Sequence, residues 1–265
     1  MLKVNNVTKI FNKSLNEEDI KVALDNVSLN VNDGDFITVI GGNGSGKSTL
    51  LNVISGALDL DEGSIIIDDA NVTKLLEHRR ATYIGIVFQD PLQGTAANMS
   101  VIENLLVASR RAKAKTLKWG FNKKDTEEFK EKLKELNLGL ENRLNQKVGL
   151  LSGGQRQALT LLMATLDKPK LLLLDEHTAA LDPKTSKTVL ELTEKIVTTN
   201  NLTTIMITHN MRDALRYGNR LLMLSEGKIV FDVAGEEKKK LSIEDLLKKF
   251  DEANIELTDQ MILNK

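Results

Sequence analysis

The nine residues GGNGSGKST at positions 41–49 constrain the fold of this chain more than any other stretch. They match the pattern G-x-x-x-x-G-K-[ST], follow the apolar run FITVI at 36–40 and precede the apolar run TLLNVISGAL. A strand, a glycine-rich turn and a helix in this order form the phosphate-binding unit of an α/β domain. The glycines let backbone N–H groups converge on one anion, and the helix N-terminus adds its positive end. The pattern G-x-G-x-x-G is not matched in this stretch, which disfavours a nicotinamide enzyme.

This loop supplies the first candidate ligands of a nucleotide. Lys47 can reach the β- and γ-phosphates, and the hydroxyl of Ser48 can ligate Mg²⁺. The whole loop is expected to hold the phosphates, through Gly41, Gly42, Asn43, Gly44, Ser45, Gly46, Lys47, Ser48 and Thr49.

A second apolar run, LLLLDE at 171–176, indicates nucleotide hydrolysis. A continuously apolar segment is typical of a strand buried on both faces of a parallel sheet, and this one ends in two carboxylates. Asp175 can hold Mg²⁺ through water, and Glu176 can act as the general base that polarises the attacking water. The alternative is a strand that simply ends in two solvated acids, which the phosphate loop upstream disfavours.

Other apolar runs predict the rest of the sheet. Strands are expected at 2–7, 22–31, 64–67, 83–88 and 203–208, followed by a hairpin over 220–232. Several of these runs are continuously apolar rather than alternating, as in a mostly parallel sheet. The region of about 91–156 holds helical signals and no convincing strand, which predicts a helical subdomain inserted into an α/β core.

Two capping boxes predict helix starts in that region. Ser100 with Glu103 precedes the first helix, and Asp125 with Glu128 precedes the second. In the second helix apolar residues recur at helical spacing up to an expected stop at Gly139, namely Phe129, Leu133, Leu136 and Leu140. The tail of 233–265 is expected to contain one short amphipathic helix, carried by Ile243, Leu246, Leu247 and Phe250.

The composition limits the function classes. The 36 basic and 37 acidic residues nearly cancel, so no overall charge attracts nucleic acid. The basic stretch 110–124, with the sole Trp119, is interpreted as a solvated face rather than an RNA site. The absence of cysteine excludes disulfides and thiolate metal sites. No signal-peptide core or membrane-length apolar run occurs, so we expect a cytoplasmic protein.

The segment LSGGQ at 151–155, twenty residues before LLLLDE, completes a set of motifs that resembles the ATP-binding cassette family. The resemblance covers nearly the whole chain up to about residue 232. It implies a phosphate-loop core with a mostly parallel sheet, an N-terminal antiparallel β subdomain and the inserted helical subdomain. Residues 1–232 would then be the ATPase domain, and 233–265 a helical tail.

The resemblance also implies roles for single residues. Residues 41–49 look like the Walker A loop and 171–175 like the Walker B strand. The remaining motif positions match the catalytic glutamate at Glu176, the Q-loop glutamine and metal contact at Gln89, the D-loop aspartate at Asp182, the switch histidine at His209 and the adenine-stacking aromatic at Phe11. The family usually has tyrosine at that last position, and phenylalanine keeps the stacking face.

The signature segment raises the question of what it binds. Ser152, Gly153, Gly154 and Gln155 stand at an expected helix start, where bare backbone donors suit a second anion site. In the family the signature of one copy closes over the ATP of the other copy. The resemblance therefore implies a head-to-tail homodimer that buries two ATP molecules.

One position departs from the family pattern. His177 stands where the motif D-E-P-T has proline, and we interpret it as a tolerated polar neighbour of Glu176 rather than a proton relay. His209 differs from the other two histidines because it follows an expected strand that ends at the active site. His78 is expected to be solvated.

The resemblance indicates a transport function. Residues 88–105 and 175–185 look most like a subgroup of bacterial importer ATPases paired with branched-chain-amino-acid-type permeases and receptor lipoproteins. We therefore expect peripheral attachment to the inner face of the cell membrane, with Leu92, Thr95 and Met99 lining an exposed groove for the permease. The alternative is a soluble single-cassette ATPase, such as one for iron–sulfur assembly. A pure scaffold would require a degraded Glu176 or His209, and both are intact.

Overall fold

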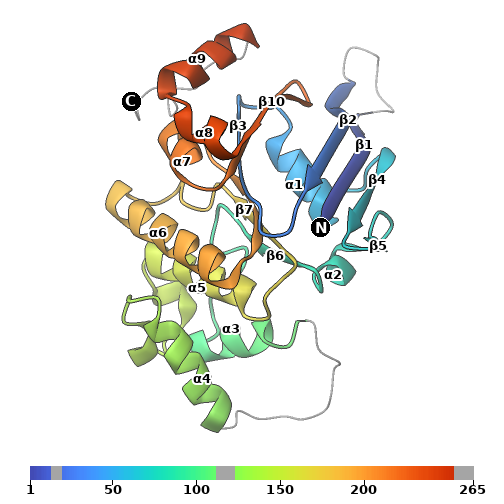
Figure 1. Cartoon of the computed structure of the whole chain (residues 1–265). Helices are drawn as coiled ribbons and strands as arrows, with labels where there is room; N and C mark the ends of the chain where they lie inside the picture. Colours follow the sequence, from blue (N-terminus) through green and yellow to red (C-terminus); the bar gives the residue numbers. More distant parts are fainter. Residues whose placement is uncertain (13–19, 112–122, 254–265) are drawn as a thin grey trace.

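The computed structural model describes residues 1–12, 20–111 and 123–253, so most of the basic stretch 110–124 lies outside the described residues. The described strands form two sheets (Figure 1). Sheet A has the order β2-β1-β4-β5 and is antiparallel. Its strands are β1 (Leu2–Phe11), β2 (Lys21–Val31), β4 (Glu62–Ile67) and β5 (Ala70–Asn71).

Sheet B has six strands in the order β10-β9-β3-β8-β7-β6. All of its pairings are parallel except the hairpin of β9 and β10. Its strands are β3 (Phe36–Gly41), β6 (Ile84–Val87), β7 (Leu171–Asp175), β8 (Thr203–Ile207), β9 (Arg220–Ser225) and β10 (Lys228–Ala234). The predicted mostly parallel sheet is thus confirmed, together with the N-terminal antiparallel sheet.

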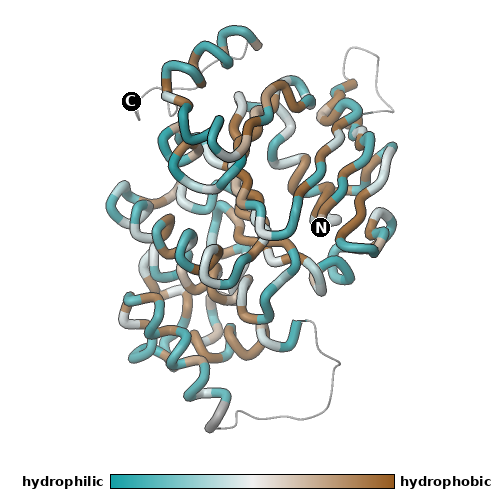
Figure 2. The backbone as a smooth tube through the Cα atoms, viewed as in Figure 1, coloured by the Kyte–Doolittle hydropathy of each residue, from teal (hydrophilic) through white to brown (hydrophobic). Residues whose placement is uncertain are grey.

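Helices cover the faces of sheet B and form a separate lobe. Hydrophobic residues lie along the central strands and on the sides of the helices that pack against those strands, while the outer turns are hydrophilic (Figure 2). The helices around the sheets are α1 (Lys47–Ser55), α2 (Glu77–Arg80), α5 (Gly153–Thr165), α6 (Pro183–Asn200) and α7 (Met211–Arg216). No helix of the described residues is long and apolar enough to cross a membrane.

The predicted helical subdomain is present. Between residues 91 and 156 the described residues form α3 (Val101–Ala108), α4 (Lys123–Lys134), two short 3₁₀ helices and the start of α5. The only β pairing among them is a single bridge between Ser100 and Lys147. The capping box at Ser100 and Glu103 is confirmed, because each side chain bonds the backbone N–H of the other.

The second capping box is wrong. The helix α4 already begins at Lys123, so Asp125 lies in its first turn instead of preceding it. An acidic residue near a helix start stabilises the positive end of the helix from either position, so the pattern alone does not fix the boundary. The helix also ends at Lys134, before Gly139, and Asn137 already has a left-handed φ of 55°. Beyond that end, Leu136 and Leu140 are still buried.

Arg80 joins the C-terminal end of α1 to the segment before α2. Its side chain is 1% exposed and its guanidinium donates hydrogen bonds to the carbonyls of Val53, Ile54, Thr73 and Leu75 at 2.7–2.9 Å. Two of these acceptors lie in the last turn of α1, where carbonyls lack helical partners and the helix end carries partial negative charge. A charged fork of donors is therefore fixed at this end of the phosphate-loop helix.

The described residues after β10 form two helices, one more than predicted. The additional one is α8 (Gly235–Lys240), and α9 (Ile243–Glu252) is the expected amphipathic helix, with Leu246 and Phe250 buried. These two side chains share a core with Met211 and Ala214 of α7. Lys238 of α8 is 2% exposed and donates to the carbonyls of Tyr217 and Gly218. Its burial lowers the pKa of Lys238 to about 8.

Candidate nucleotide site

The phosphate loop lies between the end of β3 and the start of α1. Gly46 precedes the helix with a left-handed φ of 103°, and a Cβ at that position would lie 2.5 Å from the carbonyl oxygen of Ala23. Only glycine fits there, because strand β2 presses directly on the loop. On the other side the N–H of Gly227 donates to the carbonyl of Ser45 at 3.0 Å. Both sheets therefore hold the loop in place.

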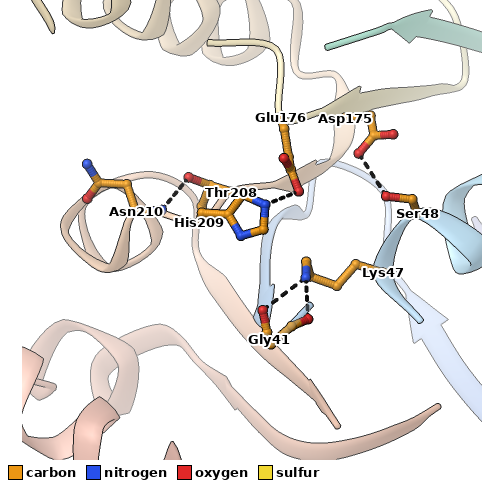
Figure 3. A network of polar contacts seen from close by, with 9 residues as sticks. Gly41, Lys47, Ser48, Asp175, Glu176, Thr208, His209 and Asn210 are labelled. Atoms are coloured by element: carbon orange, nitrogen blue, oxygen red, sulfur yellow. Dashed lines mark hydrogen bonds and ion pairs between the residues drawn. The ribbon is translucent and has the colours of Figure 1, made fainter. Parts of the chain in front are cut away.

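Lys47 is buried in the loop that it belongs to. Its Nζ donates to the carbonyls of Gly41 and Gly42, both at 2.9 Å (Figure 3). Burial lowers the pKa of Lys47, and the charges of Glu176 and Asp175 partly oppose that effect. The ammonium thus stands between the loop and two carboxylates.

Ser48 and Asp175 form the second part of the site. The hydroxyl of Ser48 donates to Oδ1 of Asp175 at 3.4 Å (Figure 3). Burial and the neighbouring Glu176 both raise the pKa of Asp175. The Ser48 hydroxyl lies beside a carboxylate whose negative charge is destabilised by the charge of Glu176. Such a pair of oxygen groups suits a hard cation such as Mg²⁺. Within the described residues no cluster of three His, Cys, Asp or Glu could hold a metal alone, so the nucleotide would have to complete its ligands.

Glu176 and His209 form the third part, at the carboxyl ends of β7 and β8. Oε1 of Glu176 lies 2.5 Å from Nε2 of His209 (Figure 3). The backbone N–H of Glu176 donates to the carbonyl of Ile207 at 3.2 Å, which ties the two strand exits together. Glu176 also has a left-handed φ of 46°, an uncommon conformation for a residue with a Cβ. Nδ1 of His209 is buried and has no partner among the described residues.

Phe11 stands beside the phosphate loop. It lines one hollow together with loop residues from Gly44 to Thr49. Lys9 lies over its ring at 5.5 Å from the centroid and is paired with Asp61. The same hollow is lined by Lys21, which sequence reasoning missed because its place depends on the register between β1 and β2.

The signature residues stand at the start of α5, as predicted. Ser152 is the N-cap and forms a reciprocal capping box with Gln155, and Gly153 begins the helix. A Cβ on Gly154 would lie 2.1 Å from Cγ2 of Thr185, so this glycine allows α5 and α6 to touch. No hydrogen bond among the described residues joins the signature to the phosphate loop.

Asp182, Gln89 and His177 lie outside the three groups described above. Asp182 is the N-cap of α6 and accepts from the N–H of Thr185 at 3.0 Å. Gln89 is exposed after β6, and no hydrogen bond connects its side chain to the described part of the site. His177 is 2% exposed, and its Nε2 lies 3.0 Å from Oγ1 of Thr193 in α6. Burial lowers the pKa of His177 to about 4. The ring is therefore a buried core group that contacts α6.

Comparisons with known proteins agree with this geometry. The model of the ABC transporter family matches residues 24–179. A tyrosine transport ATP-binding protein of Clostridioides difficile is 47% identical, over 96% of this chain and 100% of its own length. A phosphonates import ATP-binding protein of Oceanobacillus iheyensis is 35% identical, over 88% and 89%.

Solved structures show the same fold. The dimeric ATP-binding cassette MJ0796, in a post-hydrolysis state bound to ADP and Pi, is 31% identical with a TM-score of 0.75. The match covers 88% of this chain and 98% of that cassette. This chain therefore belongs to the ABC transporter family and is one of its ATP-binding and ATP-hydrolysing cassettes.

Proposed function

We propose that this chain, as a head-to-tail dimer, hydrolyses Mg²⁺-bound ATP and thereby drives uptake of a small molecule through a separate membrane permease. The observation that carries the proposal is the arrangement of three groups on neighbouring strand ends of sheet B. The buried ammonium of Lys47, the pair of Ser48 and Asp175, and the pair of Glu176 and His209 surround one position next to the phosphate loop. A γ-phosphate and an attacking water fit that chemistry.

Each group has a distinct task in this proposal. Glu176 takes a proton from the attacking water, and Nε2 of His209 holds that carboxylate in place. Ser48 and Asp175 would hold Mg²⁺, which would neutralise the charge that develops on the phosphate. Gln89 would sense the metal and the water, and Phe11 would stack on adenine.

The dimer follows from the separation of the two anion-binding motifs. The phosphate loop and the signature Ser152–Gln155 lie on different parts of the chain, and the signature offers the backbone donors of a helix start. A second copy in head-to-tail orientation would place its signature over the bound nucleotide, with Asp182 beside the contact. The dimeric state of the similar cassette MJ0796 supports this arrangement.

The substitution Glu176→Gln tests the general base and the dimer together. We expect ATP hydrolysis to slow by about 10²-fold or more, while ATP still binds. The variant should then accumulate as an ATP-bound dimer in size-exclusion chromatography. Glu191→Gln, on α6, is the matched control and should hydrolyse ATP like the wild type. A Glu176→Gln variant that stays monomeric in saturating ATP and turns over near the wild-type rate would contradict both roles.

The relatives favour uptake as the process that hydrolysis drives. The similar proteins from Clostridioides difficile and Oceanobacillus iheyensis are named for tyrosine transport and phosphonate import. We infer that this chain serves uptake of an amino acid or a related compound, with a receptor lipoprotein on the outer side. Its place would be peripheral, on the inner face of the membrane. A role in iron–sulfur assembly is not favoured.

Exposed apolar side chains mark where a permease would dock. Leu92 is 44%, Val107 61% and Leu150 71% exposed; Val107 belongs to α3, Leu150 to the 3₁₀ helix before α5, and Leu92 to the segment before α3. Apolar side chains without burial in the isolated chain are typical of an interaction surface. Thr95 and Met99, which were expected to be exposed with Leu92, are half-buried instead.

Photo-crosslinking in cell membranes tests this docking site. Crosslinkers at positions 92, 107 and 150 should capture an integral membrane protein. Leu76, which is 64% exposed near sheet A, is the matched control position and should capture none. Repeated capture of soluble iron–sulfur assembly proteins alone would refute the transport function.

A further inference from the structure

We propose that Lys21 is an additional phosphate-binding residue that contacts the α-phosphate side of the nucleotide. It lies outside the nine-residue loop motif, at the first position of β2. This inference rests on the proposed function, because it takes the phosphate loop as the nucleotide site. It adds a contact that the motif does not contain.

The register of sheet A places Lys21 opposite the aromatic residue. Phe11 and Lys21 are direct partners in the antiparallel pairing of β1 with β2. The side chains of such partners lie on the same face of a sheet, with Cβ atoms about 5 Å apart. Both side chains line the hollow next to the phosphate loop.

Strand β2 holds Lys21 close to the loop itself. Two residues further along, the carbonyl of Ala23 packs against Gly46 so closely that only glycine fits. A Cβ added to Gly44 would lie 3.6 Å from Nζ of Lys21, an ordinary van der Waals distance. The charge of Lys21 therefore stands at the outer end of the loop, while Lys47 stands at its inner end.

Lys21 also differs from its basic neighbours in having no acidic partner among the described residues. Lys9, which lies over the Phe11 ring, is paired with Asp61 at 3.8 Å. Lys228, beyond Gly227, is paired with Asp25 at 3.0 Å. An exposed ammonium next to a phosphate loop, with no carboxylate of the described residues paired to it, is suited to an anion of the ligand.

The two ends of the nucleotide define which phosphate Lys21 meets. Adenine on Phe11 and the β- and γ-phosphates at Lys47 leave the ribose and the α-phosphate between them. Lys21 shares the hollow with both residues, so its ammonium faces that middle part. ATP and ADP have the same middle part, and adenosine lacks the phosphate.

Calorimetric titration of Lys21→Gln with ATP, ADP and adenosine tests the assignment. We expect ATP and ADP to bind more weakly by the same factor, about threefold to tenfold in low salt, because the contact is solvent-exposed. The factor should shrink at high ionic strength, and adenosine affinity should not change. Lys21→Arg should restore most of the affinity, and Lys3→Gln, at the far end of β1, should bind like the wild type.

The outcomes separate this inference from the proposed function. Unchanged ATP and ADP affinities in Lys21→Gln, together with lost binding in Lys47→Ala, would overturn only the role of Lys21. An equal loss for adenosine would also overturn it, because the substitution would then act through the aromatic site. Unchanged binding in Lys47→Ala would overturn the phosphate-loop assignment and this inference together.

Discussion

Buried His177 should make the stability of the protein fall in acid. In an unfolded chain its imidazole has the ordinary pKa near 6.5, and in the folded chain burial lowers that pKa to about 4. Since Oγ1 of Thr193 donates to the carbonyl of Val189, Nε2 of His177 is the donor toward Thr193. The buried ring is therefore neutral in the folded protein near pH 7.

The sign and the size of the effect follow from linkage. A lowered histidine pKa stabilises the folded state fully above pH 6.5, and the contribution is lost as the pH falls toward 4. At about 1.4 kcal/mol per pH unit, the full difference is about 3 kcal/mol. The free energy of unfolding, measured in urea from pH 4 to 8, should show this loss in the wild type and not in His177→Leu. The variant should therefore be less stable than the wild type at pH 8 and more stable near pH 4.

The controls separate His177 from other acid effects. At pH 8 the variant should differ from the wild type only by a lost hydrogen bond, about 1 kcal/mol, since Thr193 keeps its carbonyl partner. His78→Gln, which changes an exposed histidine, is the matched control for removing an imidazole. Parallel curves for wild type and His177→Leu would refute the reasoning, as would an imidazole signal of His177 that titrates near 6.5 in NMR.

Two further substitutions test packing. Gly154→Ala should destabilise the fold by about 1–3 kcal/mol in urea unfolding, because its Cβ would lie 2.1 Å from Cγ2 of Thr185. Adding Thr185→Ser should recover most of that loss, and additive effects would show that the contact is not the cause. Arg80→Lys should cost about 3 kcal/mol or more, because an ammonium cannot satisfy four carbonyls. The exposed neighbour Arg79→Lys should be neutral, and equal stability of both variants would refute the role of Arg80.

The parts of the site that lie within short segments could be predicted from the sequence. The phosphate loop, the strand that ends in Asp175 and Glu176, and the capped helix at Ser152 are each specified by consecutive residues. The phosphate loop and the pair of Asp175 and Glu176 meet at one edge of sheet B, because the carboxyl ends of parallel strands share an edge.

Features that depend on distant partners could not be predicted. His177 is buried because it meets Thr193 on the next helix, and nothing in DEHTAALD indicates that contact. Lys21 reaches the loop only through the pairing of β1 with β2. The helix α8 has the sequence GEEKKK, which has no apolar periodicity, and it is held by a buried lysine instead.

The helix α9 shares a core with α7, and it thereby supports the segment that carries His209. His209 stands just before α7, and Phe250 and Leu246 pack beneath that helix. A chain cut after β10 would expose Met211 and Ala214 to water, two and five residues past the histidine. Truncations or fusions at α8 and α9 would therefore disturb the fold. A change in these two helices could also alter the rate of hydrolysis through α7, without altering any residue that contacts the nucleotide.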